Sequence, residues 1–399
     1  MSKLRGNLIV GQSGGPTVVI NQSLVGVIEA ALGHSEIEAI LGARHAIKGI
    51  LSEDFIDLRK PSRETLEIVA STPCAALGSV RKKPTEDERK KVFDIFKKNN
   101  VRYFFYIGGN DSAETAHLLA EQGRIENYEL RAFHVPKTID NDLLVTDHCP
   151  GFGSAARFVA LACMGDDLDN RSLPGIKINV VMGRKAGFLT AATALARQRG
   201  DDGPHLIYCP ETVFDENQFL SDVEQTYKKL GRCIVAVSEG IHRADGVEIG
   251  ATGEKDSHGN VQLSGTGALG DYLSGLIKKQ LGAALRVRSD TFGYLQRSFP
   301  GNASEVDAKE ARMAGRAAVA ASVATDAPAS GSIALRRTGN GAQYACETFT
   351  TELKNVAKNT RSMPPEFLHG SSGVTSAFLE YARPLAGPLP AKGFLLNNH

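Results

Sequence analysis

The densest group of reactive side chains lies in residues 136–142 (PKTIDND), which bring a cation, a hydroxyl group and two carboxylates together. The preceding apolar run, residues 131–135, predicts that this group stands at the end of a buried strand. Transfer of a phosphoryl group to a hydroxyl needs a base for the proton, cations that offset the charge of the moving group, and in-line positioning. Asp140 suits the base and Lys137 suits a cation, so the segment predicts phosphoryl-transfer chemistry.

Two glycine-rich loops also follow apolar runs. Residues 11–16 (GQSGGP) stand between a predicted strand and a helix through Leu32, where backbone amides and a helix N-terminus can hold a phosphate. Residues 108–112 (GGNDS) open a second helix and add the carboxylate of Asp111. A tight strand-to-helix turn explains the first loop equally well, and Asp111 can be an acid that the helix dipole stabilises. Neither the dinucleotide-binding GxGxxG spacing nor the Walker motif GxxxxGK[ST] is present.

Several arginines stand at predicted strand ends or in loops. Individually, each is more typical of a surface charge. Together they supply the bidentate donors that two phosphorylated ligands would require. These arginines are Arg81, Arg184, Arg288 and Arg297.

The elements that must position these residues are short apolar runs that alternate with helical periodicity, from the N-terminus to about Gly240. This alternation is typical of a parallel sheet, in which ligands bind beyond the carboxyl ends of the strands. The strands fall into two sets, and both are followed by glycines and charged residues. We therefore expect an α/β protein with two doubly wound, Rossmann-like three-layer domains and the active site in the cleft between them. The predicted strands are 7–10, 103–107 and 131–135 in the first set, and 177–182, 205–209 and 233–237 in the second.

Composition excludes several classes of protein. The net charge of +1 gives no general attraction to nucleic acid or to a membrane surface. The six cysteines form no CxxC pair, which argues against zinc and a disulfide framework and favours free thiols in a reducing compartment. The N-terminus runs directly into a predicted strand, and no apolar run approaches the roughly 20 residues of a membrane helix. We expect a cytoplasmic protein.

From Gly11 to about Glu310, these motifs in this order resemble those of the phosphofructokinase family. The tail from Met363 to Gly387 resembles the ends of members that use pyrophosphate. The resemblance implies reversible transfer of a phosphoryl group from pyrophosphate to the 1-hydroxyl of fructose 6-phosphate, in glycolysis or gluconeogenesis. It also implies Mg²⁺ as the cofactor and a homodimer or homotetramer.

The resemblance further implies a domain plan. Residues 1–144 would form the pyrophosphate domain, completed by part of residues 268–399. Residues 145–267 would form the fructose 6-phosphate domain, with a hairpin or loop excursion at residues 245–267. Residues 311–399 would form a helical and irregular C-terminal segment.

The matching residues take roles from the family. Asp140 would be the general base, Thr138 would position the acceptor, and Arg184 would stabilise the transferring group. The donor phosphates would be held by Gly14, Gly15 and Arg81. Besides Thr138 and Asp140, the sugar phosphate would contact Met182, Gly183, Arg184, Glu239, Tyr294 and Arg297, with Arg288 reaching across from a neighbouring subunit.

Two side chains bear on the choice of donor. In the ATP-using branch of the family, the positions of Asp111 and Lys137 are typically glycine. A carboxylate at Asp111 would crowd and repel the α-phosphate of a nucleotide, whereas the ammonium of Lys137 can balance the concentrated charge of pyrophosphate. Pyrophosphate is therefore the expected donor. An ATP-dependent enzyme is the alternative, and a non-catalytic regulatory subunit is a further one, against which the intact Thr138, Asp140 and Arg184 argue.

The chain departs from the family pattern at two positions. Many relatives have an aspartate tied to magnesium where this chain has Asn110, which can still bind a metal through its amide oxygen or a water. An arginine often crosses the subunit interface near Gly175, where the nearest cation here is Lys177. His134 and His148 flank the reactive segment, but packing or loop capping explains them better than acid–base chemistry.

Overall fold

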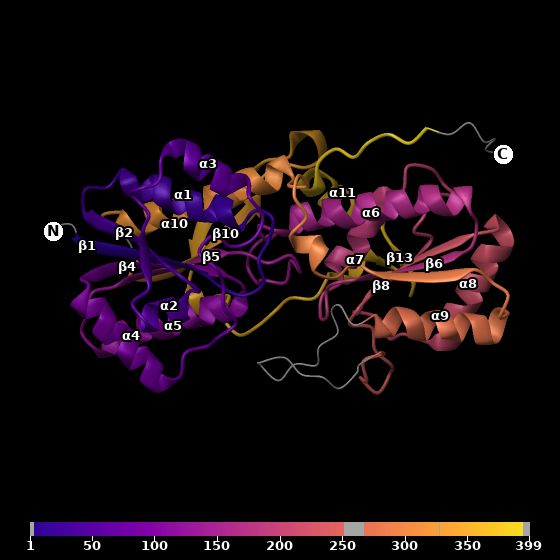
Figure 1. Cartoon of the computed structure of the whole chain (residues 1–399), viewed down its shortest axis with the longest axis horizontal. Helices are drawn as coiled ribbons and strands as arrows, with labels where there is room; N and C mark the ends of the chain where they lie inside the picture. Colours follow the sequence, from indigo (N-terminus) through magenta and orange to yellow (C-terminus); the bar gives the residue numbers. More distant parts are fainter. Residues whose placement is uncertain (1–3, 251–266, 327, 394–399) are drawn as a thin grey trace. The chain divides into compact units, whose positions relative to one another are not determined.

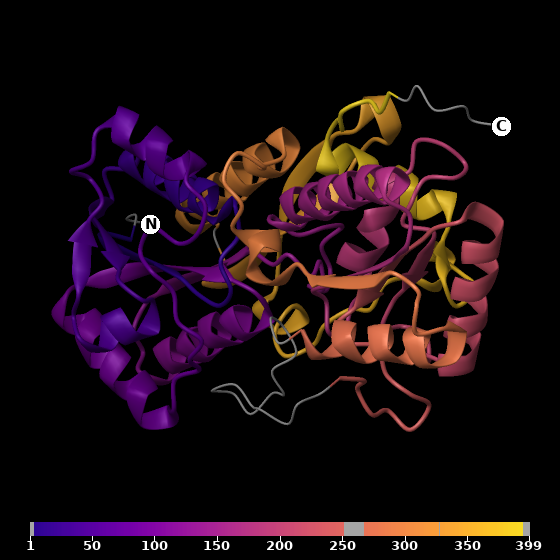
Figure 2. The ribbon, with the colours of Figure 1, turned by 45° about the vertical axis from the view of Figure 1, so that its right-hand side comes forward.

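The computed structural model describes residues 4–250, 267–326 and 328–393 (Figures 1 and 2). The chain forms two compact units. Unit 1 comprises Met1–Ser154 and Arg297–Arg361, and unit 2 comprises Ala155–Gln296 and Ser362–His399. Among the helices in these described ranges, none is both long and apolar enough to span a membrane.

Unit 1 is built on a seven-stranded sheet. Its central strands pair in parallel and are buried almost throughout, as strands covered on both faces must be. Two antiparallel strands, β3 and β11, form the edges. In spatial order the strands are β11 (Cys346–Thr351), β10 (Ser330–Arg337), β5 (Arg131–Pro136), β4 (Val101–Gly108), β1 (Gly6–Gln12), β2 (Ile37–Ala43) and β3 (Phe55–Asp57).

Helices cover both faces of this sheet (Figure 1). Successive residues of a strand point to opposite faces, so Phe105 and Ile107 of β4 join one hydrophobic core while Phe104 and Tyr106 join the other. One face carries α1 (Ile20–Leu32), α3 (Arg63–Ser71) and α10 (Glu305–Val323). The other carries α2 (Ile47–Leu51), α4 (Glu86–Lys98) and α5 (Asn110–Ile125).

Unit 2 contains a four-stranded parallel sheet and a two-stranded hairpin. Figures 1 and 2 show α6 on one face of the sheet and α9 on the opposite face. The sheet is, in spatial order, β7 (Leu206–Tyr208), β8 (Cys233–Ser238), β6 (Ile176–Val181) and β9 (Val287–Thr291), and the hairpin is β12 (Leu368–His369) and β13 (Gly373–Val374). The helices are α6 (Phe152–Ser172), α7 (Phe188–Ala192), α8 (Glu216–Leu230), α9 (Ala268–Leu281) and α11 (Ser376–Ala386). Short 3₁₀ turns span Thr193–Ala196, Gly293–Arg297 and Pro365–Phe367 in this part of the chain, and Gly341–Gln343 and Leu353–Asn355 in unit 1.

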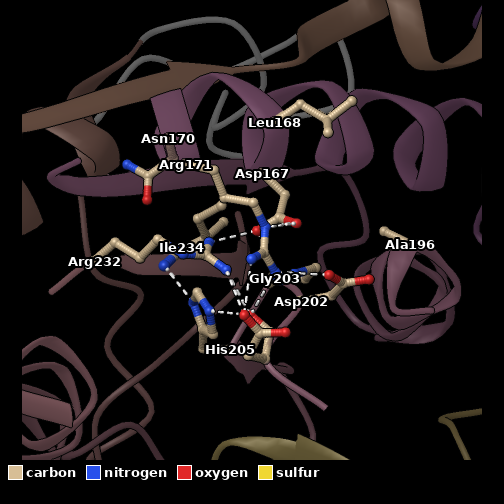
Figure 3. Close-up of polar contacts among 12 residues, drawn as sticks. Asp167, Leu168, Asn170, Arg171, Ala196, Asp202, Gly203, His205, Arg232 and Ile234 are labelled. Atoms are coloured by element: carbon tan, nitrogen blue, oxygen red, sulfur yellow. Dashed lines mark hydrogen bonds and ion pairs between the residues drawn. The ribbon is translucent and has the colours of Figure 1, made fainter. Parts of the chain in front are cut away.

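A buried ion network around Asp167, Arg171 and Arg232 ties α6 to the residue before β8 (Figure 3). Lys392, near the end of the described chain, joins this network. The Asp167 carboxylate, which is fully buried, accepts hydrogen bonds from Arg232 Nη1 at 2.5 Å and Arg171 Nε at 3.3 Å. Lys392 is 1% exposed, and its Nζ lies 2.6 Å from Asp202 Oδ2 and 3.4 Å from Asp167 Oδ2. Asp167 and Lys392, which are buried, therefore both have partners of opposite charge.

The predicted fold class is confirmed, since both sheets are largely parallel and helices cover both faces. The six predicted strands all form, within a few residues of the expected bounds. Unit 1 takes in Arg297–Arg361, which is part of the predicted stretch 268–399, whereas residues 268–296 join unit 2 through the pairing of β9 with β6. The segment 311–399 is not only helical and irregular, since β10 and β11 extend the first sheet. Of the predicted excursion at 245–267, residues 251–266 lie outside the described residues.

Candidate active site

Neighbouring residues fix the backbone of the first glycine-rich loop, residues 11–16, in unit 1. Gly14 has φ of 77°, a conformation that glycine adopts without strain. Its amide donates to Val80 O at 3.1 Å, and its carbonyl accepts a hydrogen bond from Ser79 Oγ at 2.6 Å. A Cβ at position 15 would clash with the guanidinium of Arg297. At Gly14 and Gly15 the loop therefore presents its backbone, and no side chain, to an anion bound beside Arg297.

Three cations converge on this turn. Lys137 Nζ donates to Gly15 O at 2.5 Å, although the side chain is buried. Arg297 Nη1 and Arg81 Nη2 lie beside the same glycine. Burial and the positive charge of Arg297 lower the pKa of Lys137 to about 7. Two negative charges nearby, those of Asp140 and Asp142, act in the opposite direction. The turn is an anion cradle whose central ammonium is poorly solvated.

The second loop stands beside the first. Gly108 O accepts hydrogen bonds from the backbone amide of Lys137 at 2.9 Å, and His134 Nε2 lies 2.7 Å from the same oxygen. Asn110 and Asp111 occupy the first turn of α5, where Asp111 is exposed. A helix N-terminus favours anions, so an exposed carboxylate at this place changes which anions can approach.

The reactive segment is fixed by its own side chains. Thr138 Oγ1 accepts the backbone N–H of Asp140 at 3.1 Å, and Thr138 N donates to Pro150 O at 3.2 Å. Asn141 has φ of 59°, and its Oδ1 accepts the amide of Cys149 at 2.9 Å. Burial raises the pKa of Asp142, while hydrogen bonds from its own backbone and from Thr138 act against that rise. Two carboxylates and a hydroxyl thus stand in a loop with little freedom.

The predicted sugar-phosphate residues of unit 2 cluster at the carboxyl ends of β6 and β8. The amide of Met182 donates to Gln296 Oε1 at 3.1 Å, which ties the β6 loop to the 3₁₀ turn that carries Tyr294. Gly183 has φ of 126°, and its carbonyl accepts a hydrogen bond from Ser238 Oγ at 2.7 Å. Glu239, at the end of β8, is 7% exposed, and its amide donates to Val181 O at 2.9 Å.

Arg184 has a partner that the sequence did not indicate. Its Nε and Nη2 donate to Glu248 Oε1 and Oε2, each at 2.7 Å, which makes a bidentate pair. Glu248 belongs to a small turn closed by an antiparallel bridge with His242. A bidentate carboxylate fixes the plane of the guanidinium, so Glu248 orients the cation that the sequence analysis assigned to the transferring group.

Arg297 and Arg288 have different surroundings. Arg297 ends the same 3₁₀ turn as Tyr294, and its Nη1 lies beside Gly15 of the donor loop. Arg288 is an exposed residue of the edge strand β9, where it pairs in register with Lys177. Tyr294 is 46% exposed.

The two histidines near the reactive segment have structural partners. His134 lies between Gly108 O and Ser332 Oγ, at 2.7 and 2.8 Å, and burial lowers its pKa to about 4, so it is neutral. His148 lies between Asp147 Oδ1 at 2.7 Å and Glu310 Oε2 at 2.6 Å. Burial lowers the pKa of His148, but the two carboxylates outweigh that effect and raise it.

Potential metal ligands gather at one other place in the described ranges, where His148, Glu310 and Cys346 approach one another within 4.8 Å. The charges in this cluster are already balanced, since His148 faces two carboxylates and Arg337 Nε lies 3.2 Å from Asp147. The side chains of the cluster are therefore paired with one another. All six cysteines are free thiols in the structure.

Known proteins share the sequence and fold of this chain. Residues 7–322 match the family described as Phosphofructokinase. The chain is 50% identical over 388 residues to pyrophosphate–fructose 6-phosphate 1-phosphotransferase of Rhodospirillum rubrum, which covers 96% of this chain and 95% of that relative.

Two crystal structures of pyrophosphate-dependent phosphofructokinases are also similar to this chain. The enzyme of Marinobacter aquaeolei is 31% identical with a TM-score of 0.86, covering 98% of this chain and 93% of that one. The enzyme of Nitrosospira multiformis is 34% identical with a TM-score of 0.86, covering 98% of this chain and 95% of that one.

Proposed function

This chain belongs to the phosphofructokinase family, and from that premise we propose that it transfers a phosphoryl group from pyrophosphate to the 1-hydroxyl of fructose 6-phosphate. The products are fructose 1,6-bisphosphate and phosphate. The reaction is reversible, so it serves glycolysis or gluconeogenesis. The similar enzyme of Rhodospirillum rubrum carries this activity in its name.

The observation that carries the choice of donor is the convergence of three cations on the Gly14–Gly15 turn. Pyrophosphate concentrates its negative charge in a small volume, and the ammonium of Lys137 lies within 2.5 Å of the turn's backbone. Arg81 and Arg297 supply planar guanidinium donors at the same place. A small, highly charged anion gains the most from such a cradle.

Asp111 disfavours ATP as the donor. Its carboxylate stands at the start of α5, where the backbone amides would otherwise favour a further phosphate. The α-phosphate of a nucleotide would approach this carboxylate and meet a like charge. Pyrophosphate has no third phosphate and avoids that cost. The pair of Lys137 and Asp111 thus favours pyrophosphate by attraction and disfavours ATP by repulsion.

The chemistry assigned to the loop is a single displacement. Asp140 takes the proton of the sugar 1-hydroxyl while the oxygen of that hydroxyl attacks one phosphorus of pyrophosphate. The bond from that phosphorus to the bridging oxygen breaks, and the leaving phosphate carries away the electron pair. Lys137 and Arg297 offset charge on the donor, Arg184 offsets charge on the moving group, and Thr138 positions the acceptor.

Magnesium fits the residues at the start of α5. Mg²⁺ prefers oxygen ligands and usually combines one or two carboxylates with waters and substrate phosphates. Asn110 would hold the ion through its amide oxygen at the start of α5, with waters and substrate phosphates as the other ligands. When bound, the ion would neutralise part of the pyrophosphate charge.

The proposed contacts of fructose 6-phosphate stay those predicted from the sequence, namely Thr138, Asp140, Met182, Gly183, Arg184, Glu239, Arg288, Tyr294 and Arg297. Their meeting with the donor residues across a cleft stays a prediction. We also propose a homodimer or homotetramer in the cytoplasm. The exposed side chains of Tyr294 and Leu295, next to the edge strand β9, support a partner subunit. Free, largely buried thiols support a reducing compartment.

Donor exchange tests the proposal. Initial rates are measured with fructose 6-phosphate and magnesium, with either pyrophosphate or ATP, for the wild type, for Asp140→Asn and for the double variant Asp111→Gly/Lys137→Gly. The wild type should use pyrophosphate, Asp140→Asn should lose at least about 100-fold in rate, and the double variant should gain rate with ATP while losing rate with pyrophosphate. Asp87→Gly, which removes an exposed acid from the first turn of α4, is the matched control. A wild type that uses ATP alone would reject pyrophosphate as the donor.

A further inference from the structure

The loop that carries Asp140 and Asp142 is strained. Within residues 141–147, Asn141 has φ of 59° and Val145 has φ of 73°. Asn tolerates the left-handed region, but a β-branched residue such as Val rarely adopts it. Conformations of this kind cost about 1–3 kcal/mol each and persist only where the surroundings hold them.

Arg361, more than two hundred residues further along the chain, holds this loop in its strained conformation through hydrogen bonds. Its Nε donates to Asn141 O at 2.8 Å, its Nη1 to Thr146 O at 2.7 Å and its Nη2 to Asp147 O at 2.7 Å. Its backbone amide donates to Asp142 O at 2.8 Å. The guanidinium of Arg361 therefore binds backbone carbonyls on both sides of the strained Val145. The backbone amide of Arg361 adds a fourth hydrogen bond to the same loop.

The neighbouring residue extends this contact. Thr360 forms an antiparallel bridge with Leu143, so the chain on both sides of Asp142 is bound to residues 360–361. Arg361 belongs to unit 1, as does the whole loop. Burial raises the pKa of Asp142, and the positive charge of Arg361 counts among the influences that lower it. The guanidinium thus fixes the backbone of the loop and also favours the ionised form of one of its carboxylates.

We propose that Arg361 is a positioning residue, which holds the 140–142 segment in its reactive geometry by binding three backbone carbonyls. It does not touch the substrates and takes no part in the proton transfer. The inference rests on the proposed function for its kinetic readout. Lysine cannot replace arginine here, because a single ammonium cannot span three carbonyls that a planar fork reaches.

The test compares Arg361→Ala and Arg361→Lys with the wild type and with Arg312→Ala. Arg312 is a matched control, because it is a partly buried arginine of unit 1 whose guanidinium binds Glu29 and Glu67 rather than the backbone of the loop. We expect Arg361→Ala to lower kcat with pyrophosphate by about 10- to 100-fold. Both KM values should stay within about threefold, because substrate contacts are kept. Guanidinium ion at tens of millimolar should restore part of kcat in Arg361→Ala and none in Arg312→Ala.

A second readout does not depend on activity. Amide hydrogen exchange of residues 138–147 should accelerate at least about tenfold in Arg361→Ala and in Arg361→Lys, and stay unchanged in Arg312→Ala. Unchanged exchange in both Arg361 variants would overturn the proposal, as would a wild-type kcat in a folded variant. If Arg361→Ala does not fold, Arg361→Lys decides by the same criteria. An inactive wild type would contradict the proposed function instead, and hydrogen exchange would still decide the role of Arg361.

Discussion

Pyrophosphate binding should be coupled to uptake of a proton by Lys137. Its pKa lies near 7 before the donor binds, because the side chain is buried and Arg297 is close. The Lys137 side chain is mostly a charged ammonium below this pKa and mostly a neutral amine above it. A bound pyrophosphate brings several negative charges beside the Nζ atom and favours the charged form, so it raises the pKa toward the ordinary value of about 10.4. Affinity should therefore fall as the pH rises above 7.

The size of the effect follows from the charged fraction. With a pKa of about 7, about 24% of Lys137 is charged at pH 7.5 and about 3% at pH 8.5. If the donor binds only the charged form, Kd rises about eightfold over this interval, which is about 1.2 kcal/mol. The same linkage predicts uptake of about 0.8 protons at pH 7.5 and nearly one at pH 8.5.

Isothermal titration calorimetry in two buffers of different ionisation enthalpy measures both quantities. Pyrophosphate also titrates in this range, so the wild type is compared with Lys137→Met and Lys137→Arg under the same conditions. The methionine variant has no proton to take up, and the arginine variant stays charged throughout. Both should lack the additional proton uptake and the additional pH dependence of Kd. If all three proteins show the same pH dependence, the low pKa of Lys137 or its contact with the donor is refuted.

Three further predictions concern residues near the site and in the buried network. Lys137→Met should raise the free energy of unfolding at pH 7 to 8 by about 1–4 kcal/mol in chemical denaturation, since it removes a buried ionisable group, and a loss of stability would contradict the burial argument. Glu248→Ala should lower kcat about tenfold, because Arg184 loses the carboxylate that orients it, whereas Glu248→Gln should lose less; equal rates for both variants and the wild type would exclude this role. Lys392→Met should lower the free energy of unfolding by about 1–3 kcal/mol, since Asp167 and Asp202 lose a buried hydrogen-bonding cation but keep Arg171 and Arg232 as partners, and unchanged denaturation midpoints would contradict it.

The strand-and-turn pattern predicted the parts of the site that are local in sequence. Residues 136–142 follow β5 and residues 108–112 follow β4, and these two strands are neighbours in the sheet. Parallel neighbours bring their carboxyl ends to one edge, so the cation, the base and the second glycine loop could be grouped without a structure. The neutral, structural role of His134 was also predictable, since a histidine within an apolar strand is more often packed than catalytic.

Long-range contacts could not be predicted in this way. β10 carries a short apolar run in an Ala-rich region, and its parallel partner β5 lies about two hundred residues earlier. Arg297 stands at the point where the chain returns to unit 1, and no change of composition marks that point. Arg361 acts through backbone carbonyls, which leave no sequence signal at all. Such contacts are set by the folding of the whole unit rather than by a motif.

Phosphorus-31 NMR of the reaction with fructose 6-phosphate, pyrophosphate and magnesium tests the central claim most directly. The wild type should consume the pyrophosphate resonance and produce orthophosphate and fructose 1,6-bisphosphate in equal amounts, and adding phosphate with fructose 1,6-bisphosphate should regenerate pyrophosphate. Asp140→Asn should leave the pyrophosphate resonance unchanged over the same time. Orthophosphate without the sugar bisphosphate, or transfer that occurs only when ATP replaces pyrophosphate, would contradict the account.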